Sequence, residues 1–105
     1  MRVKCAGIVF RFCAYMKKHV NIKVSGKVQG VFFRASTQET ADAFQVKGFV
    51  RNEPDGSVYI EAEAPEEKLE QFIQWCRRGP ARANVQECKV VEGTLKNFSR
   101  FVVDR

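Results

Sequence analysis

The sequence contains one histidine, His19, among its 105 residues. Catalytic zinc sites usually take two or three histidines, and a serine-type triad also depends on an imidazole. A single histidine therefore excludes metal sites built on a histidine pair and disfavours histidine-based triads. The spacing of Cys5, Cys13, Cys76 and Cys88 matches no zinc or redox motif. We expect reduced thiols, no metal and no cofactor, and we place His19 at the edge of a strand.

The chain also lacks a continuous run of ~20 apolar residues, the length that a helix needs to cross a bilayer. Its first residues are basic and lead into the apolar stretch 5–10, as in a signal peptide. However, Arg11 interrupts this stretch, and no small-residue cleavage site follows before Lys17 and Lys18. We therefore predict a cytoplasmic protein with no transmembrane segment. An amphipathic helix on a membrane surface stays open as an alternative for this segment.

Acidic residues are absent from residues 1–18, which carry five of the 18 basic residues. Residues 19–105 hold 13 basic and 12 acidic residues, so most of the net charge of +6 lies in the N-terminal segment. Because residues 19–105 are nearly neutral, they offer no strongly positive surface to a polyanion, and we expect no nucleic-acid partner. We divide the chain into an N-terminal extension, 1–18, expected to be loosely ordered, and a single domain, 19–105.

Apolar periodicity gives the expected elements, because alternation predicts strands and a spacing of three or four predicts helices. Strands are expected at 20–25, 49–52, 57–64, 85–91 and 98–103, and helices at 33–47 and 65–78. Gly48 suits the C-terminal cap of the first helix, and residues 54–56 suit a hairpin turn. The order predicts an α+β, ferredoxin-like βαββαβ plait. Its antiparallel sheet would carry both helices on one face and a short extra C-terminal strand.

The same alternation predicts which side chains are buried. On the strand 57–64, Tyr59, Glu61 and Glu63 are expected to face solvent. The alternation slips between Val85 and Cys88, which indicates a β-bulge. The predicted core consists of Ile22, Val24, Val58, Ile60, Val85 and Val90 against Phe33, Phe44, Leu69, Phe72 and Ile73.

The stretch 25–34 connects the first strand to the first helix and is punctuated by Gly26 and Gly30. Backbone N–H groups can converge in such a loop, and the helix dipole adds partial positive charge, which together favour an anion. Arg34 would supply a planar fork that fits two phosphate oxygens. The loop lacks the Gly-Lys-Ser/Thr ending of a P-loop, which disfavours nucleotide binding. A plain strand–helix connection with a surface arginine stays open.

The motif Gly-Lys-Val-Gln-Gly-Val-Phe-Phe-Arg at 26–34 resembles the first signature of the acylphosphatases. Residues 48–52, Gly-Phe-Val-Arg-Asn, followed by Gly56 and Val58, resemble the second signature, and Gly-Pro-Ala-Arg at 79–82 also fits. The resemblance covers roughly residues 19–105. One departure is Ala64, where the second signature ordinarily ends in glycine.

This resemblance implies hydrolysis of the carboxyl–phosphate bond of acyl phosphates, without a metal or cofactor. Arg34 and the loop would bind the phosphoryl group, and Asn52 would position the attacking water. The implied partner is a small-molecule acyl phosphate, and we expect a monomer. The phosphate-binding loop would comprise Gln29, Gly30, Val31, Phe32, Phe33 and Arg34.

Three alternatives stay open. Asn52 precedes Pro54-Asp55-Gly56 and would suit a purely structural turn position. Lys47-Gly48-Phe49-Val50 imitates the start of an aromatic RNA-binding signature on the same fold. An acylphosphatase-like domain that binds a partner without turnover is the third.

Overall fold

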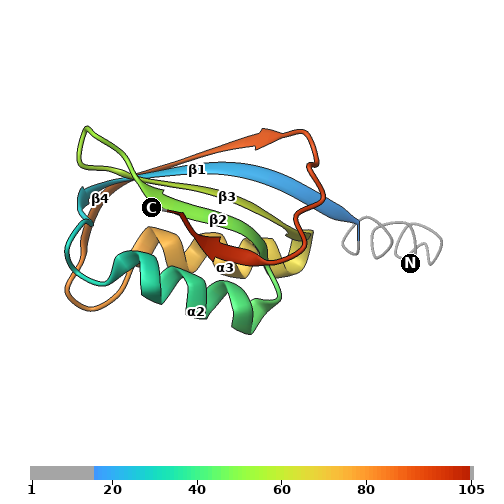
Figure 1. Cartoon of the computed structure of the whole chain (residues 1–105), viewed down its shortest axis with the longest axis horizontal. Helices are drawn as coiled ribbons and strands as arrows, with labels where there is room; N and C mark the ends of the chain where they lie inside the picture. Colours follow the sequence, from blue (N-terminus) through green and yellow to red (C-terminus); the bar gives the residue numbers. More distant parts are fainter. Residues whose placement is uncertain (1–15, 105) are drawn as a thin grey trace, which may run out of the picture.

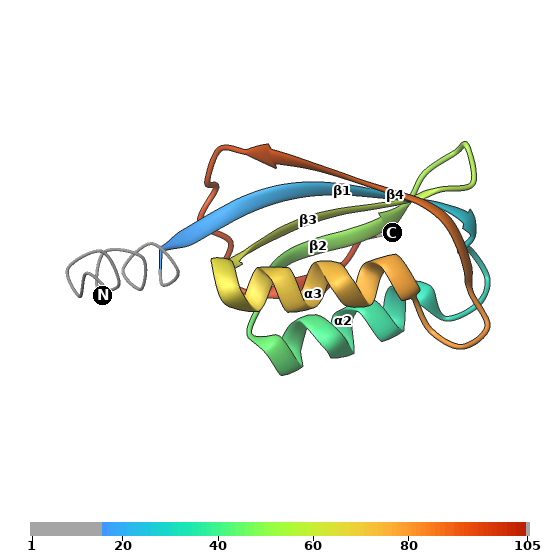
Figure 2. The ribbon, with the colours of Figure 1, turned by 180° about the vertical axis from the view of Figure 1, so that it is seen from behind.

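The structure is a computed structural model that describes residues 16–104, which form a five-stranded sheet with two helices on one face (Figure 1). The sheet order is β4-β1-β3-β2-β5. Turning the molecule shows that both helices lie side by side beneath the same face (Figure 2). The elements are β1 (Lys17–Lys27), α2 (Phe33–Phe44), β2 (Lys47–Asn52), β3 (Val58–Pro65), α3 (Glu66–Arg78), β4 (Asn84–Gly93) and β5 (Phe101–Val103).

Strands β1 to β4 form the predicted antiparallel plait, in which β1 pairs with both β3 and β4, and β3 also pairs with β2. The short strand β5 pairs with β2 in parallel, so that the complete sheet is mixed. The predicted fold class is therefore confirmed, including the extra C-terminal strand. Lys17 and Lys18, expected in the extension, belong to β1 and pair with Pro65 and Ala64. The rest of the expected extension, residues 1–15, lies outside the described residues.

The predicted end of the first helix is wrong by three residues. Helix α2 ends at Phe44, and Gln45 adopts the left-handed conformation with φ of 61°. This early end allows Val46 to turn into the core, where it is fully buried and donates to the carbonyl of Ala41. Gly48 is consequently no helix cap; it lies in β2 opposite Ala62.

The core lies between the sheet and the two helices. Val20, Ile22 and Val24 of β1 alternate toward the helices and are buried. Helix α3 contributes an apolar stripe, and α2 contributes Phe33 and Ala41. Three predicted core residues, Phe44, Val85 and Val90, are only partly buried and pack at its margin.

The predicted β-bulge is present where β4 crosses the end of β1. Ser25 lies opposite Glu87 and Gly26 opposite Val85, which leaves Gln86 as the extra residue. A Cβ atom on Gly26 would lie 2.2 Å from the carbonyl oxygen of Asn84. Gly26 therefore permits the close approach of two strands at the start of the stretch 26–34.

The prediction that Glu61 and Glu63 face solvent is wrong. Both lie on the helix-free face of the sheet, but residues 94–100 connect β4 and β5 at opposite edges and cross this face, where Lys96 and Phe98 contact Glu63. We call residues 94–100 the crossing loop. Beneath it, Glu61 and Glu63 are 7% and 0% exposed, and His19 is 2% exposed, so His19 is not a residue of the sheet's edge.

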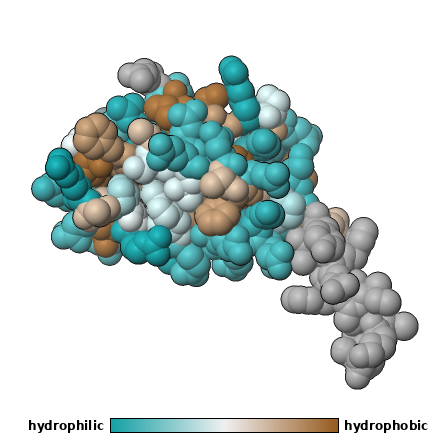
Figure 3. All heavy atoms as spheres, turned by 90° about the horizontal axis from the view of Figure 1, so that it is seen from below, coloured by the Kyte–Doolittle hydropathy of each residue, from teal (hydrophilic) through white to brown (hydrophobic). Residues whose placement is uncertain are grey.

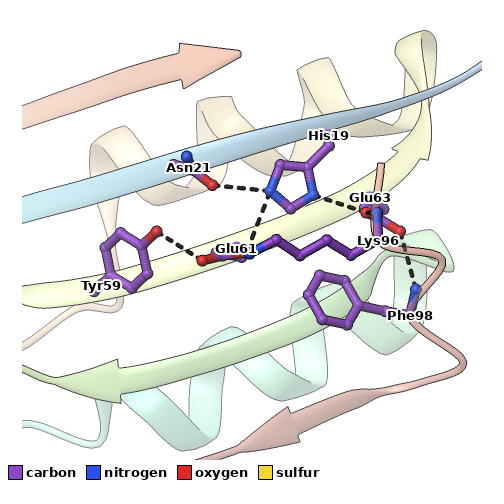
Figure 4. Close-up of polar contacts among 7 residues, drawn as sticks. All are labelled: His19, Asn21, Tyr59, Glu61, Glu63, Lys96 and Phe98. Atoms are coloured by element: carbon purple, nitrogen blue, oxygen red, sulfur yellow. Dashed lines mark hydrogen bonds and ion pairs between the residues drawn. The ribbon is translucent and has the colours of Figure 1, made fainter. Parts of the chain in front are cut away.

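The Glu63 carboxylate fixes the crossing loop to the sheet (Figure 4). Its oxygens accept the backbone N–H groups of Lys96 and Phe98, the latter at 3.0 Å, and His19 Nδ1 lies 2.7 Å from Oε2. Burial alone would raise the pKa of Glu63, but these hydrogen bonds outweigh it and hold the pKa below its usual value. The Phe98 ring stacks on His19 with centroids 5.9 Å apart.

Glu61 extends this polar cluster toward β2. His19 Nε2 lies 2.9 Å from Asn21 Oδ1 and 3.3 Å from Glu61 Oε1, and Lys96 Nζ lies 3.0 Å from the same Glu61 oxygen. The Tyr59 hydroxyl donates to Glu61 Oε2 at 2.8 Å. Burial, and then this hydrogen bond, raise the pKa of Tyr59 to about 12. The buried charges are thus paired and hydrogen-bonded, as burial requires.

The outer surface of the helix layer is mostly hydrophilic, with separate apolar patches (Figure 3). Helix α3 also places acids in its first turn and arginines in its last, which complements the helix dipole. Among the described residues, neither helix has the length and apolar character that crossing a membrane would need.

Candidate functional site

A pocket of about 400 Å³ opens where β1 leads through a loop into α2. Arg34 and Asn52, the two residues predicted to act on substrate, both line it. They come from different elements: Arg34 lies in the first turn of α2, and Asn52 ends β2. The remaining lining residues are Val28, Gly30, Phe32, Phe33, Ala35, Gln38 and Val103.

Two left-handed residues shape the loop before α2. Gly30 has φ of 73° with open space where a Cβ would lie, and Phe32, the N-cap of α2, has φ of 61°. The Phe32 side chain cannot accept a hydrogen bond, and no side chain caps this helix end. The N–H groups of the first turn therefore stay available to an anion, and the helix dipole adds partial positive charge there.

Arg34 is partly buried beside this helix end. Within residues 16–104, none of the ion pairs involves Arg34, and no acidic residue lines the pocket. The guanidinium charge is therefore not neutralised by a neighbouring carboxylate. The pocket combines one cation, a helix N-terminus and otherwise uncharged walls, which is suited to a small anion.

Asn52 is exposed at the end of β2, opposite Val58. The turn that follows is held by Asp55, whose Oδ1 accepts from the Ser57 N–H at 3.0 Å and the Ser57 hydroxyl at 2.6 Å. These bonds, together with Lys23 2.9 Å away, hold the pKa of Asp55 well below its usual range. The turn before β3 is therefore held by the side chain of Asp55.

Gln29 and Val31 belong to the predicted phosphate loop, but their side chains do not line the pocket. Val31 is buried. The Gln29 amide points to the hairpin that follows β2 and donates at 2.9 Å to the carbonyl oxygens of Glu53 and Ser57. Gln29 therefore ties the loop to the strand end that carries Asn52.

Four lining residues were missed by sequence reasoning: Val28, Ala35, Gln38 and Val103. Gln38 follows Arg34 by four positions and so shares its helix face, a signal that the sequence did contain. Its side chain donates to the Phe101 carbonyl at 3.2 Å and joins α2 to β5. Val103 had no such signal, because its place depends on the pairing of β5 with β2.

Other reactive groups of the described chain lie apart from the pocket. Residues 16–104 contain no group of three His, Cys, Asp or Glu side chains that could hold a metal ion. Burial raises the pKa of the Cys76 thiol well above its ordinary value, which disfavours the thiolate form that a nucleophile needs.

These features define a small α+β domain with an anion-binding pocket between a helix N-terminus and a strand end. The acylphosphatase family model matches residues 20–103, and the chain belongs to the acylphosphatase family. An acylphosphatase from Syntrophus aciditrophicus is 47% identical over 79 residues, which cover 75% of this chain and 82% of that protein. The assignment made from the two signatures is confirmed.

Solved structures agree with the sequence relatives. The crystal structure of an acylphosphatase from Bacillus subtilis matches with a TM-score of 0.82 and 36% identity, covering 86% of this chain and all of that one, 100%. An acylphosphatase from Coxiella burnetii matches with a TM-score of 0.81 and 33% identity, over 84% of this chain and 93% of that chain. Both of these structures are acylphosphatases, and both share the fold of this chain.

Proposed function

We propose that this chain hydrolyses the carboxyl–phosphate bond of acyl phosphates and releases a carboxylate and inorganic phosphate. One observation carries the proposal: Arg34, the uncapped N-terminus of α2 and Asn52 line a single small pocket. Membership of the acylphosphatase family supports the reaction class.

The loop 29–34 binds the phosphoryl group in this proposal. Its backbone N–H groups and those of the first turn of α2 donate to the phosphoryl oxygens, and the helix dipole favours their negative charge. The Arg34 guanidinium grips two of these oxygens in a bidentate manner. Phosphoryl transfer depends chiefly on such positioning and charge stabilisation, so few further groups are needed.

Water then attacks phosphorus on the side opposite the acyl oxygen. The new P–O bond forms as the P–O bond to the acyl oxygen breaks, and the electron pair of that bond leaves on the carboxylate. An acyl phosphate dianion and water thus give a carboxylate monoanion and dihydrogen phosphate, with both protons of the water on the phosphate. Atoms and charge balance without an external base.

The leaving group explains why the pocket can function without a general acid. A carboxylate is a weak base and leaves unprotonated, in contrast to an alkoxide. The one imidazole of the chain lies elsewhere: His19 is bound to Glu63 beneath the crossing loop, roughly 25 Å from the loop end of β1. Asn52 supplies what remains, because its amide oxygen can accept a hydrogen bond from the water and aim the lone pair at phosphorus.

The proposal is tested by hydrolysis of benzoyl phosphate, with inorganic phosphate as an inhibitor and the reaction run in ¹⁸O-labelled water. We expect turnover, competitive inhibition by phosphate, and label in the phosphate product. Label in the carboxylate would place the attack at carbon and overturn the assigned roles. Absence of turnover in the folded protein would favour the alternative of a domain that binds without catalysis.

A further inference from the structure

Phe32 is placed unusually for a large aromatic residue. Four large apolar side chains are exposed among the described residues, and Phe32, at 72%, is the most exposed of them; the others are Met16, Val91 and Leu95. Phe32 also has φ of 61°, a conformation that bulky side chains rarely adopt. No ring of the described chain stacks with it, although Phe33 beside it packs against Trp75.

The fold gains little from this ring. It lies outside the core, and the left-handed backbone that presents it is strained for any residue with a Cβ. Strain of this kind persists where the surroundings impose it and concentrates at ligand-binding positions. A glycine at position 32 would adopt the same positive φ without strain, so the turn itself does not require an aromatic residue.

The pocket has more space than a phosphoryl group fills. A water molecule occupies roughly 30 Å³ of liquid. If each non-hydrogen atom of a ligand takes the same volume, the five such atoms of a phosphate fill about 150 Å³. The pocket measures about 400 Å³. Beyond Arg34 and Asn52, its walls include the apolar side chains of Val28, Phe32 and Val103, and no acid.

We propose that Phe32 forms the apolar platform on which the acyl group of the substrate lies. The site would then select acyl phosphates whose acyl group is aromatic or branched aliphatic, over those with a short or charged acyl group. The inference rests on the proposed function and specifies its substrate class. An exposed ring at the mouth of the pocket can stack on a planar acyl group, and water leaves both surfaces when it does so.

The test compares kcat/KM for benzoyl phosphate and acetyl phosphate in the wild type, Phe32→Asn and Phe32→Leu. Asparagine tolerates the left-handed backbone, so this variant removes the apolar surface without adding strain. We expect the benzoyl-to-acetyl ratio to fall about tenfold in Phe32→Asn and only partly in Phe32→Leu, which keeps an apolar side chain. The ratio cancels any general effect on phosphate binding or folding.

Val91→Asn serves as the matched control, since Val91 is 61% exposed on β4 and does not line the pocket. Its benzoyl-to-acetyl ratio should equal that of the wild type. A ratio in Phe32→Asn within twofold of the wild type would overturn the inference while leaving the proposed function intact. Failure of the wild type to hydrolyse either substrate would overturn both.

Discussion

Gln29 and Ser57 are joined by a 2.9 Å hydrogen bond from the Gln29 amide to the Ser57 carbonyl oxygen. The same nitrogen donates to the carbonyl of Glu53, the residue directly after Asn52. One side chain of the loop 29–34 thus holds both arms of the hairpin that follows Asn52. In the proposed mechanism, Gln29 therefore helps to set the distance between the phosphoryl group and the attacking water.

Replacing Gln29 by glutamate tests this role. A carboxylate cannot donate to the two carbonyl oxygens and repels them, so the hairpin should shift relative to the loop. Displacements of about 1 Å at a reacting centre can cost 10²-fold in rate, and we expect kcat to fall about 10- to 100-fold. Gln74→Glu, on the exposed face of α3, is the control. A variant with lower melting temperature and unchanged kcat would show that Gln29 only stabilises the fold.

Arg34→Lys should weaken phosphate binding although it keeps the charge. Lysine lacks the planar fork that grips two oxygens, and we expect the inhibition constant for inorganic phosphate to rise at least about tenfold, or ~1.4 kcal/mol. Circular dichroism should be unchanged. Arg78→Lys, at the exposed end of α3, is the control. Native phosphate affinity in Arg34→Lys would exclude Arg34 as the phosphate clamp.

Asn52→Ala should separate chemistry from binding. Removing one preorganised polar group from a transition-state site typically costs on the order of 10²–10³ in kcat, and we expect a loss of this size. The inhibition constant for phosphate should change less than about twofold, because the loop and Arg34 are untouched. Asn84→Ala, exposed on β4, provides a matched substitution. If Asn52→Ala keeps its turnover, the residue has no catalytic role.

Glu63→Gln should destabilise the fold more than any surface change. The buried carboxylate accepts from Lys96, Phe98 and His19, and an amide group cannot satisfy all three donors. Loss of one partner from a buried charged network typically lowers the free energy of unfolding by about 3–5 kcal/mol, and we expect urea unfolding to show a loss of this size. Glu87→Gln is the control, since Glu87 is exposed and its ion pair with Lys89 is 3.8 Å long. It should cost under about 0.5 kcal/mol, and equal effects of the two substitutions would contradict this assignment.

The free energy of unfolding should also decrease as the pH falls. The pKa of Glu63 lies below its usual value in the folded state, so the unfolded chain takes up the proton first as the pH falls. The carboxylate therefore contributes its full stabilisation above about pH 5, and this is lost progressively below about pH 4.5. Thermal unfolding from pH 7 to pH 3 should show a steeper decline for the wild type than for Glu63→Gln. Parallel declines would mean that another group governs the acid transition.

Much of the plait could be predicted from local pattern. Alternation in β1 and β3 and the apolar stripe of α3 specify these elements. The two signatures and their spacing predicted that Arg34 and Asn52 share one site, and both line the pocket. The end of α2 was predicted wrongly, because Gly48 is the local signal for a helix stop, whereas the observed stop is at Gln45, which has no such preference. The burial of Val46 decided between them, and this depends on tertiary packing.

The crossing loop could not be predicted because it has no periodicity of its own. Alternation correctly placed Glu61 and Glu63 on the helix-free face, but strand order determines what passes over that face. The same strand order places Val103 in the pocket. RNA-binding modules of this fold use the open sheet face for bases, and here Glu61, Glu63 and His19 lie buried on that face.

The parallel pairing of β5 with β2 has a consequence for biosynthesis. The pocket joins Val28, near the start of the described chain, to Val103, near its end, and Asp104 then donates to the Val50 carbonyl. A ribosome working at roughly 5–20 residues per second needs about 4–15 s to proceed from Val28 to Val103. The nascent chain can pair β1 with β3 during this interval, but it has no complete pocket. The pocket is therefore complete only once β5 has been synthesised, when the other four strands already exist.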